Sequence, residues 1–118
     1  MFRDGSLLFK KIYIAVGYTD LRNNIDGLSF IIERKYKLSP FDEGTLFVFC
    51  GRKSDRIKAL LWEGDGFLLL YKRIEDGRFL WPRNKDELRM ITMDQFKDLL
   101  SGLLIDPSIR KVDPRLSR

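Results

Sequence analysis

Short apolar runs separated by turn residues dominate the middle of the chain, from residue 45 to residue 82. Gly-Asp-Gly at 64–66 and Asp-Gly at 76–77 interrupt these runs. Asp-Gly between strand-like residues favours a tight hairpin, because glycine adopts the positive φ that such a turn requires. The pattern therefore predicts a β-meander whose neighbouring strands are joined at these two sites.

Alternation along the strands predicts which side chains share a face. With a first loop of two or four residues, one face combines alternate residues of two strands, since side chains alternate with a period of two. This face holds Arg56, Lys58, Leu60, Trp62, Phe67, Leu69, Tyr71 and Arg73, and the second turn adds Arg78 and Leu80. A three-residue loop would reverse this parity. The opposite face is predicted to be core, with Lys72 as its one charged residue; it holds Ile57, Ala59, Leu61, Leu68, Leu70, Ile74, Phe79 and Trp81.

The first face grades from apolar near the first turn to basic and aromatic at its far end. Cations beside a flat aromatic ring suit a phosphate backbone and its bases. The candidate nucleic-acid-binding residues are Arg52, Lys53, Arg56, Lys58, Tyr71, Arg73 and Arg78. A solvated sheet face, whose Lys and Arg stems cover apolar atoms, explains the same pattern without any ligand.

Three further elements flank the meander. Residues 11–16 form an apolar run typical of a buried strand. Residues 18–38 are predicted to be a helix with an apolar stripe at Leu21, Ile25, Leu28 and Ile32, capped by Thr19 or Asp20. Gly27 is unusual inside a helix, and we expect it to allow a close approach or to break the helix.

The last predicted element is a second helix that begins at a capping box. Thr92 is the expected cap and Gln95 the residue that reaches back to it. Strands outnumber helices, so the expected fold is α+β: a mostly antiparallel sheet of about five strands, in the order β-α-β-β-β-β-α, with both helices covering its apolar face. A partly closed barrel is the alternative. We expect one domain over residues 1–105 and a mobile basic tail over 106–118.

Charge and composition narrow the chemistry. The net charge is +5, and residues 51–85 hold nine Lys or Arg against five Asp or Glu, so this segment carries +4 of it. The chain has no histidine and one cysteine, which excludes Ser-His and Cys-His catalysis, cysteine-cluster metal sites and an intrachain disulfide. Cys50 is expected to be a buried small hydrophobe. No apolar run approaches the roughly 20 residues of a membrane span, and no secretion signal is visible, so the cytoplasm is the expected compartment.

Two blocks of the chain resemble a known family. The first is the run 17–22 followed by 25–28, and the second extends from Leu46 through the Trp-Glu-Gly-Asp-Gly-Phe motif at 62–67 to Trp81-Pro82. Both are similar to the small accessory protein, often called TnpB, encoded by the second reading frame of insertion-sequence-sixty-six-type bacterial transposons. Asn23 and Asn24 depart from the family pattern where a basic and a small residue are expected.

The resemblance implies a part in moving a mobile element beside a separate, larger transposase. It carries over no catalytic residue, cofactor or metal, and we expect a non-catalytic accessory protein that binds DNA, the transposase, or both. The alternative is a pure protein-interaction module that docks on the transposase or on a second copy through Leu60, Trp62, Phe67 and Leu69. A third reading, a metal-dependent nuclease, has few unassigned acids left for it once the turn and cap residues are removed. The sequence leaves a homo-oligomer open.

Overall fold

The computed structural model describes residues 9–101. Along the chain it contains β1 (Lys11–Ala15), α1 (Ile25–Arg34), β2 (Thr45–Cys50), β3 (Arg56–Trp62), β4 (Phe67–Arg73), β5 (Leu88–Ile91) and α2 (Met93–Leu100). This order is the predicted one, and the α+β class is confirmed. The predicted tail, 106–118, lies outside the described residues.

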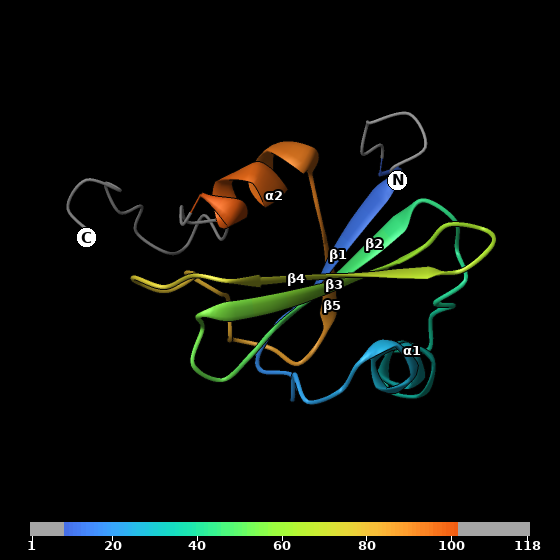
Figure 1. The fold of residues 1–118 in the computed structure, drawn as a ribbon, viewed down its shortest axis with the longest axis horizontal. Coiled ribbons are helices and arrows are strands. Elements are labelled where there is room, and N and C mark those ends of the chain that lie inside the picture. Colours follow the sequence, from blue (N-terminus) through green and yellow to red (C-terminus); the bar gives the residue numbers. More distant parts are fainter. Residues whose placement is uncertain (1–8, 102–118) are drawn as a thin grey trace.

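The five strands form one open sheet in the order β4-β3-β2-β1-β5 (Figure 1). β1 and β2 are parallel and are joined through α1, whereas the other three neighbouring pairs are antiparallel. A parallel pair requires a crossover connection, and α1 is that connection. Within the described residues β4 and β5 are the two edges, so the sheet does not close into a barrel.

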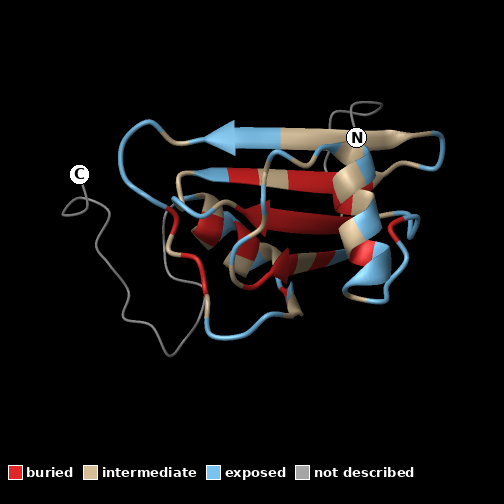
Figure 2. Ribbon diagram, turned by 90° about the horizontal axis from the view of Figure 1, so that it is seen from below, coloured by how far each residue is buried: buried red, intermediate tan, exposed pale blue. Residues whose placement is uncertain are grey.

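The two helices lie on opposite faces of the sheet, and the expectation that both cover one face is wrong (Figure 1). Leu28 and Ile32 of α1 pack with Phe47, Phe49 and Leu60. The other face packs against α2 through Phe96 and Leu99, and its buried residues include Ile12, Val48, Ala59 and Leu61. The central strands are therefore buried on both sides, as Figure 2 shows by their red colour. All six residues of β2 are buried, which explains their uninterrupted apolar run.

The predicted pairing of β3 with β4 is confirmed. Their connection has four residues, and Arg56 lies opposite Arg73, Lys58 opposite Tyr71, Leu60 opposite Leu69 and Trp62 opposite Phe67. These eight side chains share the face that α1 partly covers. The apolar residues that were predicted for the opposite face do lie on that opposite face, where they pack around Phe79 and Trp81.

The predicted hairpin at Asp76-Gly77 is wrong. Gly77 turns the chain with φ +94°, but residues 78–82 form no strand, and the fifth strand is β5. The Phe79 amide donates to the Ser54 carbonyl at 2.6 Å, and the Trp81 indole N–H donates to the Ala15 carbonyl at 2.8 Å. The segment thus crosses back over the sheet toward β1 instead of extending it beside β4, and Arg78 does not join the face of Lys58 and Tyr71.

The two helix starts differ in how well the sequence predicts them. α1 begins at Ile25, several residues after the predicted caps Thr19 and Asp20, and its cap residue Asn24 makes no side-chain capping bond. α2 begins as predicted, because Thr92 accepts from the Gln95 amide while the Gln95 side chain accepts from the Thr92 amide. The predicted capping box is confirmed.

Candidate nucleic-acid interface

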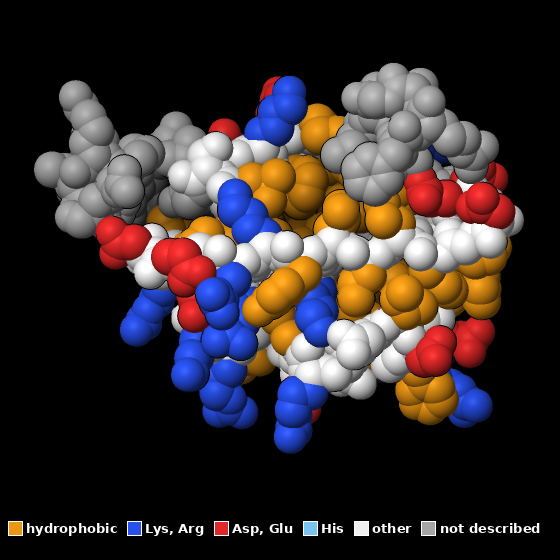
Figure 3. Space-filling view, viewed as in Figure 1, with side chains coloured by type: hydrophobic (Ala, Val, Ile, Leu, Met, Phe, Trp, Pro, Cys, Tyr) orange, Lys and Arg blue, Asp and Glu red, His pale blue; other side chains and the backbone are white. Residues whose placement is uncertain are grey.

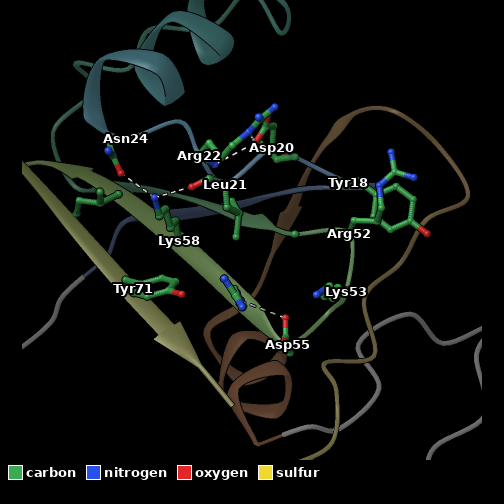
Figure 4. A pocket seen from close by; sticks show the side chains of 14 residues that line it. Tyr18, Asp20, Leu21, Arg22, Asn24, Arg52, Lys53, Asp55, Lys58 and Tyr71 are labelled. Carbon is green, nitrogen blue, oxygen red and sulfur yellow. Dashed lines mark hydrogen bonds and ion pairs between the residues drawn. The ribbon is translucent and has the colours of Figure 1, made fainter. Parts of the chain in front are cut away.

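A concave site of about 870 Å³ opens at one end of the sheet, on the face that carries α1 (Figure 4). Its walls are the loop between β1 and α1, the turn between β2 and β3, and the exposed face of β3 and β4. We call it the basic groove. Its lining residues are Tyr18, Thr19, Asp20, Leu21, Arg22, Asn24, Gly51, Arg52, Lys53, Asp55, Arg56, Lys58, Leu69 and Tyr71.

The parallel pairing of β1 and β2 assembles this groove. The carboxyl ends of parallel strands lie at the same end of a sheet. The residues that follow β1 and the residues that follow β2 therefore come together there. The Thr19 amide donates to the Cys50 carbonyl at 2.9 Å, which ties the two loops to each other. Gly17, with φ +92°, makes the turn out of β1, and its amide donates to the Pro82 carbonyl.

Lys58 holds the loop that leads into α1. Its Nζ donates to the Leu21 carbonyl at 2.7 Å, the Asn23 carbonyl at 3.1 Å and the Asn24 Oδ1 at 2.7 Å. An ammonium group has three N–H donors, and all three are used. Lys58 lies in the predicted site, but in this state it binds the protein's own backbone and has no donor left for a phosphate.

The other cations of the groove are held less tightly. Arg56 Nε lies 3.5 Å from Asp55 Oδ1, and Arg22 forms an exposed ion pair with Asp20 at 2.7 Å. That pairing lowers the pKa of Asp20 to about 2, first through the hydrogen bond from the Arg22 side chain. Within residues 9–101, neither Arg52 nor Lys53 forms an ion pair with a carboxylate.

The lining is therefore positively charged, with five Lys or Arg against the carboxylates of Asp20 and Asp55. In the space-filling view, Lys and Arg side chains gather at the lower left of the molecule, with carboxylates both above them and at the right-hand end (Figure 3). Exposed ion pairs are weak and exchange readily, so Arg22 and Arg56 stay available to an anionic ligand.

Two tyrosines stand among these cations. Tyr18 is 51% exposed, and the guanidinium groups of Arg83 and Arg52 lie 3.7 Å and 5.4 Å from its ring centroid. Tyr71 is 53% exposed on β4, with Lys58 Nζ 5.7 Å from its ring. Such cation–π contacts fix the direction of a guanidinium without neutralising its charge.

Arg83, whose guanidinium packs against the Tyr18 ring, does not itself line the groove. One of its terminal nitrogens donates to Ser54 Oγ, and Nη1 is buried without a hydrogen-bond partner among the described residues. Cys50 lies beside it, fully buried, and burial raises the pKa of its thiol to about 12, an effect that the Arg83 charge partly opposes. Cys50 is thus a protonated core residue, as the sequence suggested.

Five of the seven predicted nucleic-acid-binding residues line the groove, namely Arg52, Lys53, Arg56, Lys58 and Tyr71. The other two do not. Arg73, at the end of β4, forms an ion pair with Glu75 at 2.7 Å, and Arg78 is exposed in the segment that follows. Tyr18 and Arg22 line the groove but were not among the predicted binding residues, since the polar residues at the predicted helix start, Arg22 among them, were interpreted as caps and solvated surface. The available signal was the strand–helix–strand order around Gly17, which is typical of a parallel pair.

The residues predicted for partner binding separate into two groups. Leu60 has no exposed surface and Leu69 packs in the core beneath α1, so Leu60 is inaccessible to a partner. Trp62 and Phe67 are partly exposed at the opposite end of the sheet from the basic groove. There they contact Phe41, which the sequence analysis did not select, with ring centroids 5.1 Å and 5.3 Å away. Phe41 is 51% exposed.

Residues 9–101 offer neither a metal site nor a membrane span. This part of the chain contains no cluster of three or more His, Cys, Asp or Glu side chains that could hold a metal ion. Neither of its helices is long and apolar enough to cross a membrane.

These observations define a small α+β protein with an open mixed sheet and a cation-lined groove at one end. The chain belongs to the family of IS66 Orf2-like proteins, whose model matches residues 10–109. It is 38% identical over 93 residues to the uncharacterized protein y4hO of Sinorhizobium fredii, covering 79% of this chain and 80% of that protein. It is 30% identical over 93 residues to the uncharacterized protein y4jC of the same organism, covering 79% of each. No solved structure matches it.

The family predicted from the two sequence blocks is therefore confirmed. Membership supports an accessory role in the transposition of an IS66-type insertion sequence. The relatives' names add no ligand or partner to this assignment.

Proposed function

We propose that this protein is a non-catalytic accessory factor of transposition that binds DNA through the basic groove. The observation that carries the proposal is the position of Arg52 and Lys53. Both line a concave surface, next to Arg56 and Tyr71, and neither has a carboxylate partner within the described chain. Unneutralised cations in a concave wall raise the local concentration of a polyanion.

The chemistry of the groove suits a phosphodiester backbone better than a neutral ligand. Arginine guanidinium groups bind phosphate oxygens in a bidentate manner, and the contacts of Arg52 with Tyr18 hold such a group in place. Binding to phosphates releases counterions from DNA, so the affinity falls steeply as the salt concentration rises. Tyr71 offers an exposed ring on which an unpaired base can stack.

A salt titration tests this proposal. Fluorescence anisotropy of a labelled duplex from the end of the element should show binding that weakens linearly in a plot of log affinity against log salt. The double variant Arg52→Ala/Lys53→Ala should bind more weakly to all sequences and lower the slope by about 1 for each lost phosphate contact.

The control variant is Arg34→Ala/Lys97→Ala, which removes the same charge from exposed positions on α1 and α2. It should keep most of the affinity, because the effect depends on where the charges lie and not on net charge alone. Equal loss in both double variants, or binding that does not respond to salt, contradicts the proposal.

A second candidate function is docking on the transposase, and it rests on Phe41, Trp62 and Phe67. Three rings with centroids about 5 Å apart form an exposed aromatic cluster at the end of the sheet away from the groove. Aromatic residues are enriched at protein interfaces, where they supply much of the binding energy.

Co-purification with the transposase after nuclease treatment tests this second function. Phe41→Ser should reduce the amount of transposase retained, because it removes the most exposed ring of the cluster. Phe30→Ser is the matched control, since Phe30 is 57% exposed on α1. If neither variant changes the amount of transposase retained, the aromatic cluster is not the docking surface.

A further inference from the structure

Among the described residues, β4 is an edge strand whose outer side pairs with no other strand. It is seven residues long and pairs with β3 alone among the described strands. In Figure 2 it is the outermost strand, tan at its start and pale blue at its C-terminal end. A long strand with an open edge is a template for pairing with another strand, and proteins that do not use such an edge usually shorten or cover it.

The hydrogen-bond pattern determines which groups of β4 face outward. The Glu63 amide donates to the Gly66 carbonyl directly opposite, and the Ile74 amide donates to the Asp55 carbonyl directly opposite. Bonded and non-bonded pairs alternate along an antiparallel ladder, so the even-numbered residues of β4 bond β3. The amides and carbonyls of Phe67, Leu69, Tyr71 and Arg73 therefore point away from the sheet.

The sequence of β4 is complementary to itself in the antiparallel direction. It begins with Phe67 and a run of three leucines and ends with Lys72 and Arg73, and the turn before it carries Asp65. When two copies of the strand run in opposite directions, the basic end of each lies beside the acidic turn of the other. Leucines then lie opposite leucines, and no two like charges oppose each other within the strands.

We infer that β4 pairs with β4 of a second copy of this chain, antiparallel and centred on Leu69. In this register Phe67 of one copy lies opposite Tyr71 of the other, and the outward amides and carbonyls of both strands are satisfied. Arg73 of each copy lies next to Asp65 of the other. Arg73 is already paired with Glu75, but that pair is exposed and can exchange for Asp65.

The occupant is a second copy because this edge supplies both halves of the contact. A strand from an unrelated protein would have to match an apolar centre with a cation at one end and an acid at the other, whereas a second β4 matches it by symmetry. Two-fold symmetric dimers, with the same patch used on both subunits, are the commonest assemblies of soluble proteins. The inference does not depend on DNA binding.

The pairing has one consequence for the basic groove. Two antiparallel edge strands that continue one sheet are related by a two-fold axis perpendicular to it, so the same face of each copy lies on the same side. Both grooves, which include Leu69 and Tyr71 of β4, then open on one face of a ten-stranded sheet. Such an arrangement fits a DNA site with two-fold symmetry.

Sedimentation equilibrium of the full chain, without DNA, tests the inference over a range from about 1 to 200 µM. The protein should change from monomer to dimer as its concentration rises. Asp65→Lys and Arg73→Glu should each weaken the dimer by roughly tenfold or more, since each places like charges together at two symmetric contacts. The double variant Asp65→Lys/Arg73→Glu should restore it, because the swapped charges attract again.

Amide exchange measured by NMR locates the contact. The amides of Phe67, Leu69 and Tyr71 should become protected as the concentration rises, whereas those of Leu68 and Leu70 are protected throughout. Asp94→Lys on α2 serves as the charge control and should leave the dimer unchanged. A monomer at every concentration, or a dimer whose double variant is no stronger than the single variants, overturns the inference.

Discussion

Lys58 is the residue on which the shape of the basic groove depends. It extends from β3 and uses all three donors on the loop before α1, so it fixes Leu21, Asn23 and Asn24 against the sheet. A lysine among basic neighbours suggests phosphate binding from its sequence context, but here its role is to position a wall of the groove. Arg52 and Lys53, in the turn between β2 and β3, keep their charges exposed.

Lys58→Met should lower the free energy of unfolding by about 1–3 kcal/mol. The methionine keeps the apolar stem but removes a charged donor and leaves two carbonyls and an amide oxygen without their partner. Urea denaturation measures the loss, and Lys97→Met, at an exposed position on α2, should change stability by less than about 0.5 kcal/mol. Equal effects of the two substitutions would show that the three bonds stabilise nothing.

Cys50 makes the stability depend on pH on the alkaline side. Burial raises the pKa of its thiol from 9.0 to about 12, so the folded state holds a proton that the unfolded chain releases above pH 9. Its contribution is complete below pH 9 and is lost as the pH rises toward 12.

Compared with Cys50→Ala, the natural protein should therefore lose an additional 2–3 kcal/mol, roughly, between pH 9 and 11, because each unit of pKa difference corresponds to about 1.4 kcal/mol. Urea denaturation of both proteins at pH 8, 10 and 11 measures this difference. Parallel curves for the two proteins would contradict the prediction. The comparison cancels other groups that titrate in this range, such as Tyr36, whose pKa burial also raises.

At the scale of elements, the start of α1 shows how a glycine makes room for the turn that precedes a helix. A Cβ added at Gly27 would lie 2.2 Å from Asn23 Oδ1, and the same Asn23 side chain donates to the Asp20 carbonyl at 2.9 Å. The residues before Ile25 are thus folded into a turn that packs against the first turn of the helix. Gly27 leaves room for this turn, which a side chain at position 27 would crowd, and the helix begins after it at Ile25.

Gly27→Ala should therefore destabilise the protein by about 1–2 kcal/mol, although the same change inside most helices stabilises by about 1 kcal/mol. In an Asn23→Gly background the contact is gone, and Gly27→Ala should be neutral or stabilising. A double-mutant cycle by urea denaturation should give a coupling energy of at least about 1 kcal/mol. Additive effects would show that the two residues do not compete for space.

At the scale of the whole molecule, the groove cations and the aromatic cluster lie at opposite ends of the sheet. Arg52, Lys53 and Arg56 lie at one end, and Asp42, Glu43 and Asp65 lie in the connections at the other, beside the aromatic cluster. The proposed DNA binding, with its salt dependence, would use the first end, and the proposed transposase docking would use the second. Pairing of β4 with a second copy would use the edge between them, so the three contacts do not compete for one surface.

Alternation and turn chemistry determined much of this protein from its sequence. The loop of 63–66 and the period of two set the pairing of β3 with β4, and therefore which side chains join Lys58 and Tyr71 on one face. The capping box at Thr92 set the start of α2. These features depend on neighbours a few residues apart, so the chain specifies them locally.

Only the tertiary structure decided the rest. The parallel pairing of β1 with β2 joins segments about 34 residues apart, and it alone brings the loop of Tyr18 and Arg22 to the turn of Arg52. The return of residues 78–82 toward β1 depends on a distant acceptor, the Ala15 carbonyl, and not on the turn at Asp76-Gly77. A local period carries no information about such partners, because packing across the sheet selects them after the strands have formed.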